Sequence, residues 1–144
     1  MISALPSVLI ALLLGSGITI QIFFLPALIN RISDRSSVTR VSTAVLRNHH
    51  LLSILLLIPA CALFASSGRL PAAAIAAALL LLNLYQRFWI FTKMHLVKQP
   101  IGVQDLIQPD NVLREEFNRL QHRAFFLFRI HLLLLLIDLI AAAF

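Results

Sequence analysis

Four long apolar stretches, separated by shorter polar segments, dominate the hydropathy pattern of this chain. They cover about residues 5–29, 36–66, 71–98 and 110–144. A helix that crosses roughly 30 Å of hydrocarbon needs about 20 residues, and each stretch provides that length. The pattern therefore predicts an all-α integral membrane bundle of four transmembrane helices that forms a single domain.

Turn and capping residues mark where these helices begin. Pro71 follows the turn signal of residues 66–69 and suits a first helical turn, and Asp110 is a good N-cap for the last helix. The uncharged core of the second helix is only residues 51–66, so the polar segment before it must continue the same helix. At 1.5 Å per residue the last two helices reach about 40 and 50 Å, beyond the hydrocarbon thickness. Helices two to four should therefore extend past the membrane on one side.

Composition predicts that the protein lies in the membrane, and the distribution of charge predicts its orientation there. Apolar residues make up 60% of the chain and charged residues 12%, whereas soluble domains carry about 25% charged residues. Four lysines and arginines lie in residues 31–47 and six in residues 87–123, against Arg69 alone between the second and third helices. The positive-inside rule then predicts both termini outside and both long connections in the cytoplasm. A bacterial cytoplasmic (inner) membrane is the default expectation, with anionic headgroups as partners of the basic side. Because the basic residues fall in two segments that join apolar stretches, no nucleic-acid partner is expected.

Several chemistries lack the residues that they need. Cys61 is the only cysteine, so an intramolecular disulfide, a paired-cysteine redox motif and a cysteine zinc motif are excluded. The chain contains no HExxH, GxSxG or glycine-rich phosphate loop. An enzyme is therefore the less favoured class, and no catalytic residue and no metal site is assigned.

Polar side chains inside a membrane span are costly, so each is a functional candidate. The candidates within the spans are His50, Asn83, Arg129, His131 and Asp138. His131 and Asp138, seven residues apart on one helix face, could form a proton- or cation-handling pair. The structural alternative is that Asp138 reaches the outer interface and His131 bonds a neighbouring helix. His50 and His131 are predicted at similar depth and could ligate a haem b iron; otherwise no cofactor is expected.

A second group of polar residues is expected at the cytoplasmic edge of the bundle, near one level. It comprises His49, Gln86, Arg87, Glu115, Arg119 and His122. One interpretation is a layer of ion pairs and hydrogen bonds that fixes the register of the helices. The other is a cationic cleft for an anionic headgroup or a small anion.

Three blocks of sequence carry a resemblance to a known family. They are Gly17 with residues 23–28 (FFLPAL), the basic connection through Arg31 and Val41 into Leu46 and the pair His49-His50, and residues 117–123 (FNRLQHR). In these blocks the chain resembles the transmembrane-protein-205-like domains, small four-helix membrane proteins of unknown activity, and more distantly the copper-resistance-D-type proteins. The resemblance implies a polytopic bundle of unassigned chemistry, with His122 as the one position carried over.

The sequence also departs from the family pattern. Gln121 separates the leucine from the histidine, and Arg129 stands where a small polar residue is usual. Copper handling is not implied, because Met1 and Met94 are the only methionines and soft ligands are scarce.

Two main classes of function fit these features. The first is a non-enzymatic accessory subunit that docks onto a larger membrane complex or onto copies of itself. The second is an oligomeric transporter or channel subunit for a small solute or ion, with His131 and Asp138 lining the path. A haem b or quinone-linked membrane redox subunit that uses His50 and His131 is a third, less favoured class.

Overall fold

The computed structural model describes residues 4–98 and 112–143, and within these ranges the only regular structure is helical. Four helical spans are long and apolar enough to cross a membrane: Leu5–Arg31, Ser37–Ser66, Leu70–Val97 and Arg114–Ala143. These spans confirm the predicted all-α architecture of four helices that are long and apolar enough to cross a membrane. The predicted start of the last helix at Asp110 lies outside the described residues.

Each span is built from one or more helical segments. The first comprises α1 (Leu5–Ile18), η2 (Thr19–Phe24) and α2 (Leu25–Arg31), and the second is α3 (Arg35–Ser66). The third comprises α4 (Leu70–Tyr85), η3 (Gln86–Ile90) and α5 (Phe91–Lys98), and the fourth is α6 (Val112–Ala143).

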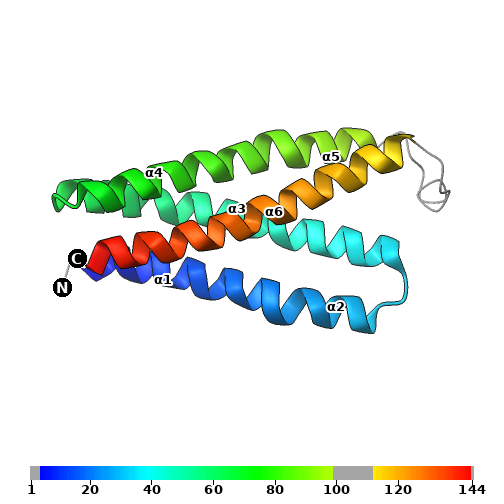
Figure 1. Cartoon of the computed structure of the whole chain (residues 1–144), viewed down its shortest axis with the longest axis horizontal. Helices are drawn as coiled ribbons and strands as arrows, with labels where there is room; N and C mark the ends of the chain where they lie inside the picture. The colour runs from blue at the N-terminus through cyan, green and yellow to red at the C-terminus, as the bar shows by residue number, and fades with distance from the viewer. Residues whose placement is uncertain (1–3, 99–111, 144) are drawn as a thin grey trace.

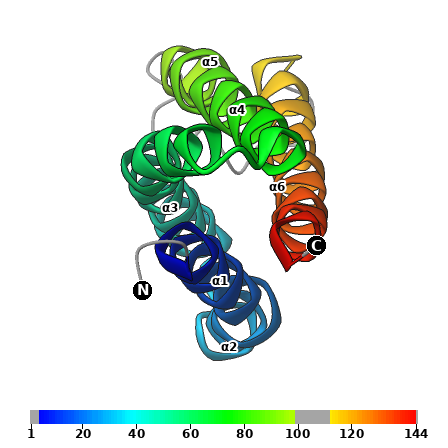
Figure 2. The ribbon, with the colours of Figure 1, turned by 90° about the vertical axis from the view of Figure 1, so that its left-hand side faces the viewer.

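The four spans form a closed ring when the bundle is viewed along its length (Figure 2). α3 packs against α1 and α4, and α6 packs against the same two helices on the other side. α1 and α4 are therefore diagonal partners, as are α3 and α6. Figure 1 shows that α1 begins and α6 ends at the same end of the bundle, which we call the terminal end. The opposite end, where α2 joins α3, is called the connection end.

A short turn, residues 67–69, joins α3 to α4 at the terminal end. Gly68 has a φ of 75°, a left-handed conformation that glycine adopts without steric cost. The Arg69 guanidinium then donates a 2.7 Å hydrogen bond from Nη1 to the backbone carbonyl of Ala142. The turn is thereby tied to the last carbonyls of α6, which have no partner within their own helix.

Two of the spans change from α-helix to π-helix for about one turn. These wider turns are η2 in the first span and η3 in the third. Pro26 follows η2 and has no N–H to donate to Ile22, four residues earlier, so regular α-helical bonding fails there. In the third span the wider turn brings the neighbours Ile90 and Phe91 to the buried side together.

The interior has two apolar clusters, one in each half of the bundle. In the terminal half, Ile10, Leu57, Phe64, Leu79 and Leu135 are almost completely buried. In the connection half the buried members include Ile90, Phe91, Met94, Phe117 and Phe128. Between the two clusters lies a layer of buried polar side chains, while leucines and isoleucines cover much of the outer surface. Such an outer surface suits contact with lipid chains.

Candidate functional site

Three histidines meet inside the bundle between the two apolar clusters. His49 and His50 come from α3 and His131 comes from the diagonally opposite α6. The ring centroids lie 6.2 Å apart for His49–His50, 5.9 Å for His49–His131 and 6.0 Å for His50–His131. His50 and His131 are completely buried, and His49 is 5% exposed. His50 and His131 thus lie at the same depth, as their positions in the sequence indicated.

Asn83 of α4 links two of these imidazoles through one carboxamide. Its Oδ1 lies 2.6 Å from His50 Nδ1, and its Nδ2 lies 3.1 Å from His131 Nδ1. Nδ2 also donates a 2.7 Å hydrogen bond to the carbonyl of Leu79. This last bond fixes which way the carboxamide points, because a reversed amide would place its oxygen against the Leu79 oxygen.

The Asn83 bonds assign opposite tautomers to the two histidines. A carboxamide oxygen only accepts and a carboxamide nitrogen only donates, so His50 Nδ1 carries a hydrogen and His131 Nδ1 does not. In the neutral rings, His50 therefore has a bare Nε2 and His131 has an Nε2–H. Neither Nε2 atom has a hydrogen-bond partner among the described residues. The pair thus presents one unpaired acceptor and one unpaired donor in a buried position.

His49 is held by serines from two helices. Its Nε2 lies 3.2 Å from the Ser16 Oγ of α1. The Ser16 hydroxyl already donates to the Leu13 carbonyl at 2.9 Å, so Ser16 accepts the hydrogen of His49 Nε2. The Ser53 hydroxyl donates to the backbone carbonyl of His49 at 2.9 Å and lies 3.4 Å from its Nδ1. Of the three imidazoles, His49 is therefore the one whose Nε2 has a partner.

Aromatic rings close the cluster on its connection side. The Phe128 ring lies 5.3 Å from His49 and 5.9 Å from His50, both edge-on, and stacks on His131 at 6.3 Å. Phe91 lies 5.6 Å from His50. These apolar walls lower the local dielectric, which strengthens the hydrogen bonds that are made and raises the cost of those that are not.

Two glutamines add further unpaired atoms near this layer. Gln86, one turn beyond Asn83, is completely buried, and both of its carboxamide atoms lack a partner among the described residues. Gln21 of the first span has a buried Oε1 without a partner among the described residues. Gln86 and Gln21 both lie in the π-helical segments. Such π-turns often occur at functional sites.

The structure also places the other polar residues predicted within the spans. Asp138 lies on the His131 face of α6, about 10 Å further along the axis at 1.5 Å per residue. It is completely buried, and both of its carboxylate oxygens lack a partner among the described residues. Asp138 thus faces the interior of the bundle and not its outer surface, and His131 bonds a neighbouring helix, as the structural alternative predicted. Arg129 is exposed beside a surface hollow that Gln21 and Ser42 also line.

The residues predicted to share the cytoplasmic edge are separated in the structure. His49 and Gln86 belong to the buried polar layer. Glu115 and Arg119 instead line a surface hollow near the connection end, and Glu115 is 16 residues, about 24 Å, from His131. The remaining two are His122, which is exposed, and Arg87, which is partly buried. The expected single level was wrong, because Glu115 is more than four helical turns from His131, the residue of the same helix that lies beside His49.

The arrangement of His50 and His131 does not fit their joint ligation of a haem iron. In a bis-histidine haem, the two Nε2 atoms bind the iron from opposite faces, so the two Nδ1 atoms point away from each other. Here one carboxamide bonds both Nδ1 atoms, and it could not do so across a porphyrin. In residues 4–98 and 112–143, no three or more histidine, cysteine or carboxylate side chains are grouped to hold a metal ion.

Sequence reasoning missed the partners of His49. Neither Ser16 of α1 nor Ser53 of α3 was among the residues predicted for the site. Ser53 lies four residues after His49 and Phe128 lies three before His131. At this helical spacing Ser53 shares a helix face with His49, and Phe128 shares one with His131. The spacing is the sequence signal that could have identified both residues.

Comparisons with known proteins return no match to a family model, a curated protein or a solved structure. The resemblance to the transmembrane-protein-205-like and copper-resistance-D-type families therefore stays a prediction. We therefore infer the chemistry of the site from its contacts.

Proposed function

We propose that this protein is a subunit of a membrane transporter or channel and that its buried histidine cluster carries protons. The observation that carries the proposal is the pair of Nε2 atoms that find no partner in the described part of the chain, an acceptor on His50 and a donor on His131. A layer that only fixed helix register would satisfy its own hydrogen bonds. Unpaired titratable groups within a span are typical of proton relays and ion paths, which favours transport over a purely accessory role.

His50 and His131 have different roles in the proposed proton relay. His50 binds a proton at Nε2 and keeps its Nδ1–H bond to Asn83, so protonation leaves the network intact. His131 binds a proton only at Nδ1, which faces the donor Nδ2 of Asn83, so its protonation breaks that bond. His50 is therefore the proton acceptor of the cluster. A water molecule that donates to His50 and accepts from His131 would join the two free nitrogens.

Asp138 extends the route toward the terminal end. It is a further ionisable side chain on the same face of α6, with both oxygens unpaired among the described residues. About 10 Å separates it from His131 along the axis, so protons would need a chain of two or three waters between them. The charge asymmetry supports an orientation with the connection end in the cytoplasm, and the membrane proposed is the bacterial inner membrane. In this orientation Phe144 lies outside the cytoplasm. We therefore expect a reporter fused after Phe144 to show no cytoplasmic activity.

The direct test is proton flux into liposomes that contain the purified protein and a pH-sensitive dye. A potassium gradient with valinomycin supplies the driving force. We expect flux above that of empty liposomes for the wild type and background flux for His50→Phe. The matched control is His122→Phe, which alters an exposed histidine outside the cluster and should retain wild-type flux. Wild-type flux equal to that of empty liposomes would overturn the proposal.

The tautomers can be tested without any transport assay. In ¹⁵N-histidine-labelled protein in lipid nanodiscs, NMR should show His50 with its hydrogen on Nδ1 and His131 and His49 with theirs on Nε2. The exposed His95 and His122 serve as internal references for water-exposed rings. A spectrum in which His50 and His131 share one tautomer would refute the division of roles.

A further inference from the structure

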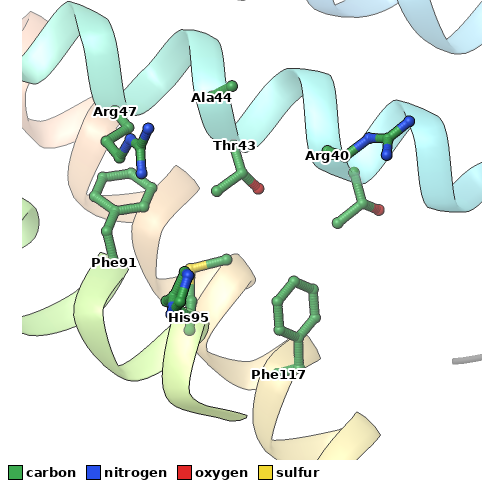
Figure 3. A pocket seen from close by; sticks show the side chains of 9 residues that line it. Arg40, Thr43, Ala44, Arg47, Phe91, His95 and Phe117 are labelled. Atoms are coloured by element: carbon green, nitrogen blue, oxygen red, sulfur yellow. The ribbon is translucent and has the colours of Figure 1, made fainter. Parts of the chain in front are cut away.

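A cleft opens between α3, α5 and α6 in the connection half of the bundle (Figure 3). One wall is α3, whose Arg40, Thr43 and Arg47 side chains project from the helix, and Phe91 and Phe117 stand opposite. The phenylalanines are buried, whereas both arginines are exposed. The cleft therefore combines an apolar wall with a row of hydrogen-bond donors.

Within residues 4–98 and 112–143, the donors in the cleft have no anionic partner. Arg40 and Arg47 are seven residues apart and so share a face of α3, with Thr43 between them. The residues that line the cleft include His95 but no aspartate or glutamate. Among the described residues, neither guanidinium forms an ion pair. Guanidinium and hydroxyl groups arranged in this way suit an anion with several oxygens, above all a phosphate group.

The position along the bundle places the cleft at the edge of the membrane. Arg47 lies 19 residues before Ser66, the last residue of α3, which is about 29 Å at 1.5 Å per residue. This length matches the hydrocarbon thickness of roughly 30 Å, and Arg40 lies about 10 Å further out, at headgroup depth. On the third span, the outward-facing Trp89 marks the same boundary. Its ring stacks with that of Tyr85, and Lys93 Nζ lies 4.7 Å from its centroid.

We propose that this cleft binds an anionic phospholipid. The phosphate group meets Arg40, Arg47 and the Thr43 hydroxyl, and the acyl chain lies along the apolar wall of Phe91 and Met94. Phe91 also packs against His50, so the lipid would sit one ring away from the histidine cluster. The proposal does not depend on proton transport, because it concerns different atoms and a different ligand.

The test is the affinity of the purified full-length protein for phosphatidylglycerol, measured in detergent by native mass spectrometry. Phosphatidylcholine with the same acyl chains is the neutral comparison. We expect the double variant Arg40→Gln/Arg47→Gln to bind phosphatidylglycerol roughly thirtyfold more weakly, equivalent to about 2 kcal/mol for two arginine contacts. Its binding of phosphatidylcholine should be unchanged.

A matched control separates the cleft from general charge attraction. Arg119→Gln/Arg123→Gln removes the same charge from a surface hollow that Glu115 and Glu116 also line, and it should change phosphatidylglycerol affinity less than twofold. Ala44→Phe fills the cleft without changing charge and should also weaken binding. If the two arginine pairs lose affinity equally, or if the cleft variant loses none, the assigned site is wrong.

A competition arm distinguishes a lipid from a soluble phosphate compound. Glycerol 3-phosphate carries the headgroup phosphate without acyl chains. We expect no displacement of phosphatidylglycerol at millimolar glycerol 3-phosphate, because the apolar wall contributes to binding the lipid. Displacement at that concentration would assign the cleft to a soluble anion and overturn the lipid proposal.

Discussion

Gly17 of α1 lies so close to Leu132 of α6 that a Cβ atom at position 17 would overlap the Cδ2 methyl of the leucine. The next atom that such a Cβ would meet is His49 Nε2, at 3.4 Å. Glycine therefore lets α1 approach α6 beside the bond between Ser16 and His49. Small residues at helix contacts in membranes act in this way.

Replacing Gly17 with valine should destabilise the bundle. The tip of Leu132 can rotate away from an alanine methyl, but valine adds two further methyl groups and pushes toward His49. We expect Gly17→Val to lower the free energy of unfolding in detergent by about 1–3 kcal/mol, as overpacking does. The control is Gly15→Val, because nothing lies within 4 Å of a Cβ at that position. Equal losses in the two variants would contradict the close contact.

Removing the Asn83 carboxamide should leave two histidines without partners. Asn83→Leu keeps the approximate volume but leaves His50 Nδ1–H and His131 Nδ1 unbonded. We expect a loss of about 1–2 kcal/mol in unfolding free energy in detergent, within the range for polar contacts between membrane helices. Unchanged stability would mean that the carboxamide does not hold the two rings.

Asn83→Asp provides a sharper readout at the same position. A carboxylate accepts from both rings, so His131 should move its hydrogen from Nε2 to Nδ1. The ¹⁵N shifts of His131 report this change, and those of His50 should keep their tautomer. A spectrum in which His131 stays in its wild-type tautomer would show that position 83 does not select it.

The depth of the histidines could be predicted from the sequence, but the side that each one faces could not. Hydropathy and the helical rise place His50 and His131 along the bundle axis. Neighbouring residues on a helix point about 100° apart, so the sequence did not show that His49 also turns inward to meet Ser16. That outcome depends on α1, which approaches closely only because of Gly17.

The π-helical turns explain a second gap between sequence and structure. A hydropathy pattern assumes 3.6 residues per turn, whereas η3 contains a wider turn that buries Ile90 and Phe91 side by side. Phe91 therefore faces the interior, where it packs on His50. Gln86 was expected at the membrane edge but is completely buried.

The hydrogen bond between Arg69 and Ala142 should stabilise the terminal end locally. Arg69→Gln removes the guanidinium that donates the 2.7 Å bond to the Ala142 carbonyl, a bond worth about 0.5–1.5 kcal/mol. We expect faster amide hydrogen exchange in residues 139–143, with little change in the histidine layer. Arg31→Gln, which removes an exposed arginine at the other end, should leave this exchange unchanged. Slow exchange in Arg69→Gln would mean that the bond contributes nothing to the end of α6.

Substitutions of Asp138 should show whether its carboxylate is functional or structural. It is completely buried beside the apolar cluster of the terminal half, with both oxygens unpaired among the described residues. Burying a polar group without a partner costs about 1–3 kcal/mol, so Asp138→Leu should raise the free energy of unfolding in detergent by that order.

The same Asp138→Leu substitution should abolish proton flux in liposomes if the carboxylate extends the relay. Asp138→Asn keeps the shape of the side chain and should also lose flux, but it should gain less stability than Asp138→Leu because the amide still lacks partners. A leucine variant that is less stable than the wild type would show that the carboxylate is satisfied in the folded bundle. A stabilised leucine variant with full flux would remove Asp138 from the proton route and leave the histidine cluster as its only candidate.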